Sequence, residues 1–305
     1  MASSDPDETA DAELGGWKTV SHRGDRAAAI AVWSAALGIS GMLLWIVADV
    51  LIGAASGAAV DDWGSFLTAV PSALGVRGGI GSILVSTGLI LAVCLGAALP
   101  LGLGTAILLT ETGATRGDAG MARAVRRSLD VLAGVPSIVF GLFGSVLFCE
   151  VMGMGFSIKA GGLTLACMVL PIFIRAAEDS LRAVPESWRQ GATALGLSRV
   201  TALRRVILPA ALPGLTVAFV LGVGRALAET AALLFTAGTV MRMPESLDDS
   251  GRALSVHIYE LAMFVNGGEP AAYRSAAVLM VLLLGINLGA AAAGHRWMAH
   301  NRTGA

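Results

Sequence analysis

Charged residues are scarce in this chain of 305 residues: Asp, Glu, Lys and Arg together supply 14%, whereas they make up about a quarter of a soluble domain. Hydrophobic residues supply 55%, and the mean hydropathy is +0.74. This balance excludes an ordinary soluble fold and indicates an integral membrane protein. The net charge of -1 gives no reason to expect a nucleic-acid partner.

Residues that carry chemistry or hold metals are also few. The three cysteines, Cys94, Cys149 and Cys167, stand in apolar stretches without paired spacing, which excludes a disulfide framework. The four histidines are scattered, so we expect no metal site. The chain lacks the G-x-x-x-x-G-K-[ST] loop that holds nucleotide phosphates. We therefore expect no enzyme activity, no catalytic residue and no cofactor on this chain.

Long apolar runs are what the sequence has in abundance. A helix needs about 20 residues to cross a bilayer, and six stretches reach or approach that length. The sequence therefore predicts an all-α integral membrane protein with six transmembrane helices. The predicted spans are Ala27–Ile52, Gly81–Leu109, Leu129–Met152, Gly161–Ala177, Leu212–Phe235 and Ala276–His295.

The placement of Lys and Arg predicts the topology. They concentrate at the N-terminus, in the second and fourth loops and at the C-terminus. Because Lys and Arg favour the cytoplasmic side, we expect a multi-pass protein with both termini in the cytoplasm. The first residues are acidic and poor in apolar side chains, which predicts a mobile cytoplasmic tail over 1–26. A transmembrane permease domain over 27–300 follows.

The fifth loop, about 237–274, lies outside on this topology. Leu254, Ile258, Leu261 and Val265 recur there at helical spacing, which predicts an amphipathic helix on the outer surface. Two roles remain open for it: docking a receptor, or closing the outer mouth of the bundle.

The fourth loop, about 178–211, is long and polar. It contains the string QGATALGLSRVTALRRVILP from Gln190 to Pro209, which predicts a helix-turn-helix that returns to apolar residues. The spacing resembles the EAA loop of ABC-importer permeases, a cytoplasmic segment that docks on the ATP-hydrolysing subunit. Gln190 and Gly191 stand where that family has Glu and Ala. The resemblance implies ATPase coupling through Pro185, Gln190, Gly191, Ala192, Gly196, Leu208 and Pro209.

Arg225 and Glu229 lie inside the fifth predicted span, where ionisable side chains cost several kcal/mol unless they pair, face other helices or line water. Their four-residue separation predicts that both lie on one helical face. They could be a neutral pair with a structural role only. Alternatively, the guanidinium could bind a tetrahedral oxyanion while Glu229 tunes or gates it.

Two further elements are candidates for the pathway. Arg175, three residues before Glu178, either reaches the lipid headgroups or converges with Arg225 on a doubly charged anion. Pro136 and its flanking glycines predict a local break, which either turns the Ser137 hydroxyl toward a cavity or is a packing kink.

These elements together resemble the PstA family of phosphate-import permeases over about 81–296. The strings that carry the resemblance are RALAETAALLFTA from Arg225 to Ala237, GVPSIV from Gly134 to Val139, and Leu170-Pro171 followed by Arg175 and Glu178. Ala228 and Ala232 depart from a family Gly and Pro. The substrate-pathway residues implied are Arg175, Arg225, Glu229, Ser137 and Thr230.

The resemblance implies a type I, MetI-like ABC-importer fold in the bacterial cytoplasmic membrane, with the helix at about 185–195 as the cytoplasmic coupling helix. It implies import of inorganic phosphate with three partners: a PstC-like permease in a heterodimer, a PstB-like ATPase dimer that holds ATP and Mg, and an external PstS-like binding protein. Two alternatives stay open, an ABC permease for sulfate or molybdate and a stand-alone carrier that uses Glu229 for proton coupling.

Overall fold

The computed structural model describes residues 22–56, 63–111 and 119–302. The chain divides into two compact units, Met1–Asp49 and Val50–Ala305. Helix α2 (His22–Ser56) supplies the described part of the first unit and corresponds to the first predicted span. It begins within the predicted tail, and the rest of that tail, 1–21, lies outside the described residues.

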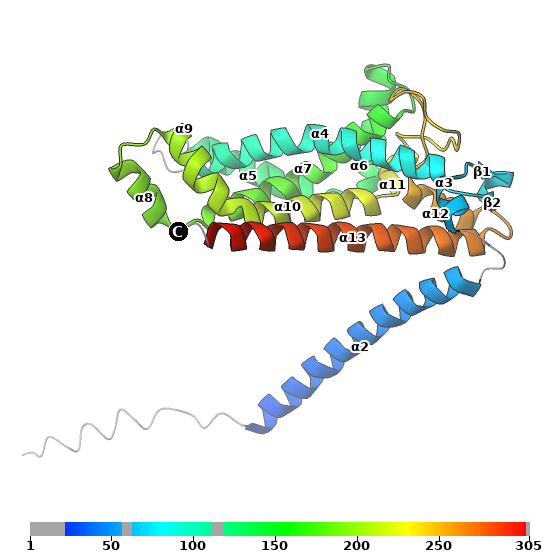
Figure 1. The fold of residues 1–305 in the computed structure, drawn as a ribbon, viewed down its shortest axis with the longest axis horizontal. Coiled ribbons are helices and arrows are strands. Elements are labelled where there is room, and N and C mark those ends of the chain that lie inside the picture. Colours follow the sequence, from blue (N-terminus) through cyan, green and yellow to red (C-terminus); the bar gives the residue numbers. More distant parts are fainter. Residues whose placement is uncertain (1–21, 57–62, 112–118, 303–305) are drawn as a thin grey trace, which may run out of the picture. The chain divides into compact units, whose positions relative to one another are not determined.

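The second unit is almost entirely helical (Figure 1). Its long helices are α4 (Gly81–Glu111), α7 (Ile158–Arg182), α10 (Leu208–Ala228) and α13 (Glu269–Arg302). Its shorter elements are α3 (Trp63–Thr68), α5 (Ala119–Ala133), α6 (Ser137–Gly144), the π-helix η3 (Ser145–Val151), α8 (Glu186–Ala194), α9 (Arg199–Ala202), the π-helix η4 (Leu203–Ile207), α11 (Ala231–Leu234) and α12 (Leu254–Met263). The strands β1 (Pro71–Ser72) and β2 (Arg77–Gly78) form a small antiparallel hairpin around the turn η2 (Ala73–Gly75).

Five helices in the described residues are long and apolar enough to cross a membrane, or six if one bent pair counts as a span. The predicted all-α membrane class is therefore confirmed. The fourth span is longer than predicted, because α7 begins at Ile158 and continues through Glu178 to Arg182.

Helix α7 is the centre of the second unit and packs on α4 along one side and on α10 along another. Glycines allow this close packing. A Cβ atom at Gly162 would lie 2.6 Å from Val93 of α4, and one at Gly214 of α10 would lie 2.6 Å from the Ser180 hydroxyl. Lipid supplies no hydrophobic drive between helices, so van der Waals contact between small residues holds such interfaces together.

The third predicted span, Leu129–Met152, is wrong as a single helix. Helix α5 ends at Ala133, α6 begins at Ser137, and the two segments are bent by 101°. Pro136 explains the break, because it lacks the N–H of a helical hydrogen bond and disfavours helical geometry in the residue before it. Glycines on α6 then face close neighbours, since Gly141 lies against Ala232 of α11.

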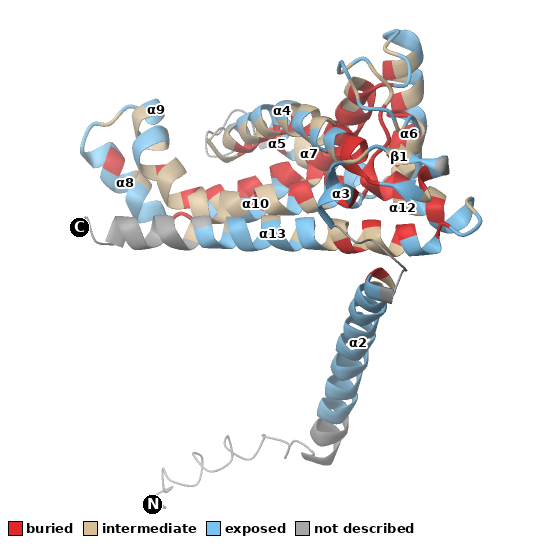
Figure 2. Ribbon diagram, turned by 45° about the vertical axis from the view of Figure 1, so that its right-hand side comes forward, coloured by how far each residue is buried: buried red, intermediate tan, exposed pale blue. Residues whose placement is uncertain are grey.

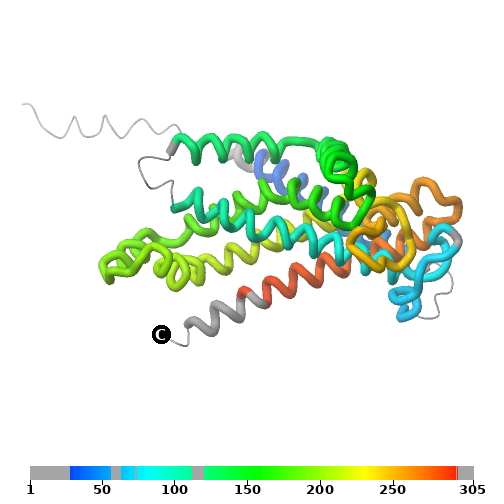
Figure 3. Tube along the Cα trace, turned by 90° about the horizontal axis from the view of Figure 1, so that it is seen from above, coloured from blue at the N-terminus to red at the C-terminus, as the bar shows by residue number. Residues whose placement is uncertain are grey.

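The second unit carries different elements at its two ends. Helices α8 and α9 lie at one end, beside the C-terminal part of α13, and β1, β2, α3 and α12 lie at the other (Figures 1 and 3). Buried residues gather along α7 and at the end of the unit that carries α12, whereas α8 and α9 are largely exposed (Figure 2). An apolar bundle thus separates a polar hairpin from a compact loop region.

The amphipathic helix predicted in the fifth loop is present as α12. Leu254, Val256 and His257 in its first turns are fully buried, and Leu254 shares a hydrophobic cluster with Phe66. The helix packs on α4, α10 and α13, while Met263 at its end is exposed. One face of α12 therefore belongs to the bundle, and its place on the outer side of the membrane stays a prediction.

Candidate functional site: an anion pathway and a coupling hairpin

Arg225 and Glu229 form no ion pair with each other in the described residues, so the alternative of a neutral structural pair is not observed. Helix α10 ends at Ala228, and Glu229 is extended (φ -76°, ψ 131°). Its carboxylate accepts a hydrogen bond from the backbone N–H of Ala232 at 3.3 Å, and its carbonyl accepts one from the Ser255 hydroxyl. Glu229 therefore caps the short helix α11. Its negative charge is used at the N-terminus of this helix rather than in an ion pair with a guanidinium.

Arg225 stands alone on the last turn of α10. Its residue is exposed in this chain, and it forms no hydrogen bond or ion pair with the described residues. An unpaired guanidinium next to hydrocarbon costs several kcal/mol, so this side must face water or another protein chain in the membrane. Because a guanidinium carries a fixed charge and a planar fork of donors, it is suited to bind an oxyanion there.

The contacts of α7 show which of the candidate pathway residues lie at the same height along the bundle. Gly214 lies on Ser180 and Gly222 on Val169, so Arg225 is roughly level with residues 166–169 of α7 at 1.5 Å per residue. Helix α5 also runs antiparallel to α7, because Arg126 pairs with Glu178 while Asp130, farther along α5, pairs with the earlier residue Arg175. Its end at Ala133 therefore lies roughly level with residue 171.

The breaks before α6 and α11 thus come together near the level of Arg225. Ser137 begins α6, Thr230 precedes α11, and α6 and α11 pack directly on each other. Both residues are half-buried, and the Thr230 side chain makes no capping bond. Three of the predicted pathway residues, Ser137, Arg225 and Thr230, therefore occupy one region of the bundle, beside the capping carboxylate of Glu229.

Arg175 belongs to a different level, about 10 Å closer to the end of the unit that carries α8, from the helical rise along α7. Its guanidinium forms an ion pair with Asp130 of α5, and a longer bond of 3.4 Å to the Arg126 carbonyl. It makes no ion pair with Glu178 among the described contacts. Arg175 and Arg225 are therefore two successive cationic positions along the bundle.

Glu178 is the centre of an ionic cluster that the sequence did not predict. It is buried and pairs with Arg126 at 2.8 Å and with Arg182 at 2.7 Å. Arg126 also donates to the Leu109 carbonyl near the end of α4 at 2.9 Å. The cluster joins the ends of α4 and α7 to the middle of α5. The signal for it was an Arg-rich α5 whose polar residues recur at helical spacing.

The polar hairpin forms as the sequence predicted. Helix α8 follows Pro185 and ends before Leu195, and Gly196 adopts a positive φ of +69° that closes the turn. The Ser198 hydroxyl caps α9 by accepting from the Thr201 N–H at 3.3 Å. On α8, Gln190 and Gly191 are exposed while Ala192 is buried, and α10 begins at Leu208 with Pro209 in its first turn.

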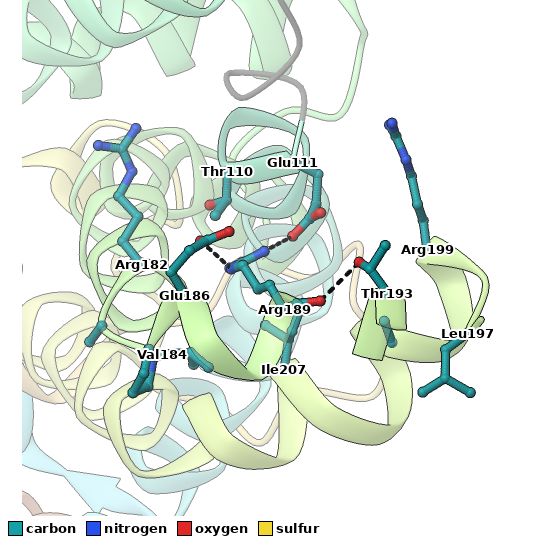
Figure 4. A pocket seen from close by; sticks show the side chains of 13 residues that line it. Thr110, Glu111, Arg182, Val184, Glu186, Arg189, Thr193, Leu197, Arg199 and Ile207 are labelled. Carbon is teal, nitrogen blue, oxygen red and sulfur yellow. Dashed lines mark hydrogen bonds and ion pairs between the residues drawn. The ribbon is translucent and has the colours of Figure 1, made fainter. Parts of the chain in front are cut away.

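Arg189 ties α8 to the bundle. Its guanidinium pairs with Glu111 at the end of α4 at 2.6 Å (Figure 4). It also donates to the Leu181 carbonyl of α7 at 3.1 Å. Glu186 lies at 3.8 Å. The tie crosses a cavity of about 590 Å³ whose wall includes all three elements. Movement of α8 would therefore be carried to α4 and α7 together.

Comparison with known proteins agrees with this arrangement. Residues 98–293 match the family described as "Binding-protein-dependent transport system inner membrane component". The chain belongs to this family. As a member it is a multi-pass inner membrane protein and a transport permease subunit.

Relatives and solved structures support this membership. The chain is 31% identical to "Probable ABC transporter permease protein YqgI" of Bacillus subtilis, over 86% of this permease and 93% of the relative. It is 36% identical to "Phosphate transport system permease protein PstA 1" of Mycobacterium tuberculosis H37Rv, over 64% and 62%. It thus spans a little under two thirds of the length of the mycobacterial relative.

The fold is that of solved ABC importers. A chain of the MetNI methionine ABC transporter, in inward-facing form, matches with a TM-score of 0.57 at 18% identity, covering 70% of this permease and 95% of that chain. A chain of a bacterial ABC transporter that imports the polysaccharide alginate matches with a TM-score of 0.52 at 16% identity, covering 87% and 96%. The predicted type I, MetI-like fold is confirmed.

Proposed function

We propose that this permease is the PstA-type subunit of an ATP-driven importer for inorganic phosphate. The PstA relatives and the signature from Arg225 to Ala237 support the substrate. The observation that carries the proposal is the unpaired guanidinium of Arg225 beside two helix breaks. Phosphate offers the guanidinium a tetrahedral set of acceptor oxygens, and bidentate contact of this kind is strong and geometrically specific.

The chain's own groups divide the work at this level. Arg225 supplies the charge, while the Ser137 and Thr230 hydroxyls are available as neutral hydrogen-bonding groups on the neighbouring breaks. Glu229 holds α11 in place through the Ala232 N–H, so a change at Glu229 acts by moving Thr230. Helix breaks that line a cavity are a recurrent way to build solute sites within membranes.

Partners complete the proposed machine. The exposed face of α8, with Gln190 and Gly191, docks on a PstB-like ATPase dimer that holds ATP and Mg. A PstC-like permease faces the exposed side of Arg225 across the route of the anion, and a PstS-like binding protein delivers phosphate at the end of the unit that carries α12. Both chain termini are then cytoplasmic, which fits the position of the C-terminal part of α13 beside α8.

Uptake by the reconstituted complex tests the proposal. Arg225→Gln and Arg225→Lys should abolish ATP-dependent uptake of radiolabelled phosphate, because neither keeps a planar charged fork. Normal uptake by either Arg225 variant would remove this residue from the pathway.

Competing anions and omission of the ATPase test the two alternatives in the same vesicles. Unlabelled phosphate should compete strongly, and sulfate and molybdate weakly. Stronger competition by sulfate or molybdate would assign another oxyanion. Uptake without the ATPase subunit would assign a secondary carrier.

A further inference from the structure

Asp130 has no role in the function proposed above, yet its carboxylate is placed directly on a candidate pathway cation. It lies on α5 and forms an ion pair with Arg175 of α7. About half of each side chain is exposed in this chain, 56% for Asp130 and 44% for Arg175. Arg175 lies within a helix long and apolar enough to cross the membrane.

The exposed sides of these two charged side chains cannot face lipid. Ionised side chains within a span face protein or a water-filled route, because hydrocarbon offers neither solvation nor partners. The exposed side of Arg175 and Asp130 therefore faces either the second permease or the route of the solute. A guanidinium on that route attracts any anion that arrives, and Asp130 is the anion already bound to it.

The charged side chains around Arg175 carry more positive than negative charge. Among the described residues, Arg126, Arg175 and Arg182 are joined by ion pairs to two carboxylates, Asp130 and Glu178. Glu178 is buried and accepts from two of the guanidinium groups, so it is not free to serve the third. Asp130 is therefore the one ionic partner of Arg175 in the described part of the chain, and these five side chains carry one more positive charge than negative.

We propose that Asp130 is the resident counter-ion of Arg175 and that the transported anion displaces it. The Arg175–Asp130 pair is then an inner gate, about 10 Å beyond Arg225 by the helical rise. Phosphate leaving Arg225 exchanges one ionic partner of Arg175 for another, so the guanidinium is paired throughout, while the displaced Asp130 carboxylate turns to its exposed side. Release to the cytoplasm follows when Asp130 rebinds Arg175. This assignment rests on the proposed function, because it takes phosphate as the anion.

Equilibrium binding of radiolabelled phosphate to the complete complex in nanodiscs, without the external binding protein, tests the gate. Asp130→Asn removes the competing charge at nearly constant shape and should tighten binding about fivefold, the size expected for loss of a part-exposed ion pair. Asp130→Glu should behave as the unaltered protein. Asp179→Asn, which neutralises an exposed carboxylate of α7 that is outside the described ion pairs, is the matched control and should change nothing.

The double variant Asp130→Asn with Arg175→Gln should lose the gain, because the gain acts through Arg175. Weaker or unchanged binding by Asp130→Asn would overturn the gate, as would a gain that persists without Arg175. Asp130→Ser replaces the Asn variant if that one does not assemble. Failure of both to assemble, with Asp130→Glu intact, would give the pair a structural role and also overturn the gate.

Sulfate and molybdate in the same binding assay separate this inference from the proposed function. Tighter binding of sulfate or molybdate than of phosphate by the unaltered complex would refute the phosphate assignment only. The effect of Asp130→Asn, measured with the preferred anion, would still decide whether Asp130 is a displaceable counter-ion.

Discussion

Replacing Arg189 with Gln should weaken the connection between α8 and the bundle while leaving the exposed face of α8 intact. The guanidinium makes two charge-assisted hydrogen bonds, to Glu111 at 2.6 Å and to the Leu181 carbonyl at 3.1 Å. The side chains of Arg189 and Glu111 are 19% and 31% exposed, so solvent screens the pair only in part. We expect a loss of about 2 kcal/mol, at the lower end of the range for hydrogen bonds to charged groups.

The assay is the ratio of phosphate imported to ATP hydrolysed in proteoliposomes that contain the whole complex. Arg189→Gln should keep the ATPase subunits bound, because Gln190 and Gly191 are unchanged, but should lower the ratio several-fold. Arg189→Lys keeps a charge for Glu111 without the planar fork and should be intermediate. Coupled transport at the unaltered ratio in the Gln variant would refute the reasoning.

A double-mutant cycle then tests whether Glu111 is the relevant partner. Arg189→Gln and Glu111→Gln should be non-additive in thermal stability, because each removes the same ion pair. Additive losses would show that the two side chains act independently.

Three further predictions follow from packing, backbone conformation and burial. Gly144→Ala should destabilise the protein by about 1–3 kcal/mol in thermal unfolding, because its Cβ would overlap Thr164, and Thr164→Ala should restore part of the loss. Gly196→Val should distort the turn after α8 and so weaken co-purification of the ATPase, because the φ of Gly196 is +69°, which a β-branched residue rarely adopts. Gly191→Ala should not destabilise α8, because Gly191 has helical geometry. Burial lowers the pKa of His257 to about 4. The free energy of unfolding should therefore be at its full value above pH 6.5 and should fall by about 3 kcal/mol toward pH 4, because the unfolded chain binds the proton more tightly. His257→Leu should remove this contribution when unfolding is measured across the pH range.

Much of this fold follows from local sequence. Hydropathy predicted the spans because lipid requires about 20 apolar residues per helix. The polar helix between Pro185 and Leu195 was predictable because a proline starts it and a glycine with positive φ follows it. Gly196 lies at the turn after this helix and Leu208-Pro209 lies at the start of α10, as the spacing predicted.

The helix breaks and ionic contacts were less accessible from sequence. Arg225 and Glu229 fit a helical face by spacing, but the carboxylate instead caps α11, which depends on Ser255 and α12 holding the break. The right-angled bend after α5 was signalled by Pro136, though its angle depends on how α6 packs on α11. The Asp130 and Arg126 contacts depend on the alignment of α5 with α7, and no sequence period encodes that alignment.

The central claim is that Arg225 meets the passing anion. The most direct measurement is an electron cryo-microscopy structure of the complete complex with phosphate trapped in the permease pair. We expect density for the anion within hydrogen-bond distance of the Arg225 guanidinium, near the breaks at Ser137 and Thr230. An anion bound elsewhere, with Arg225 directed toward acyl chains or sealed in a protein interface, would contradict it.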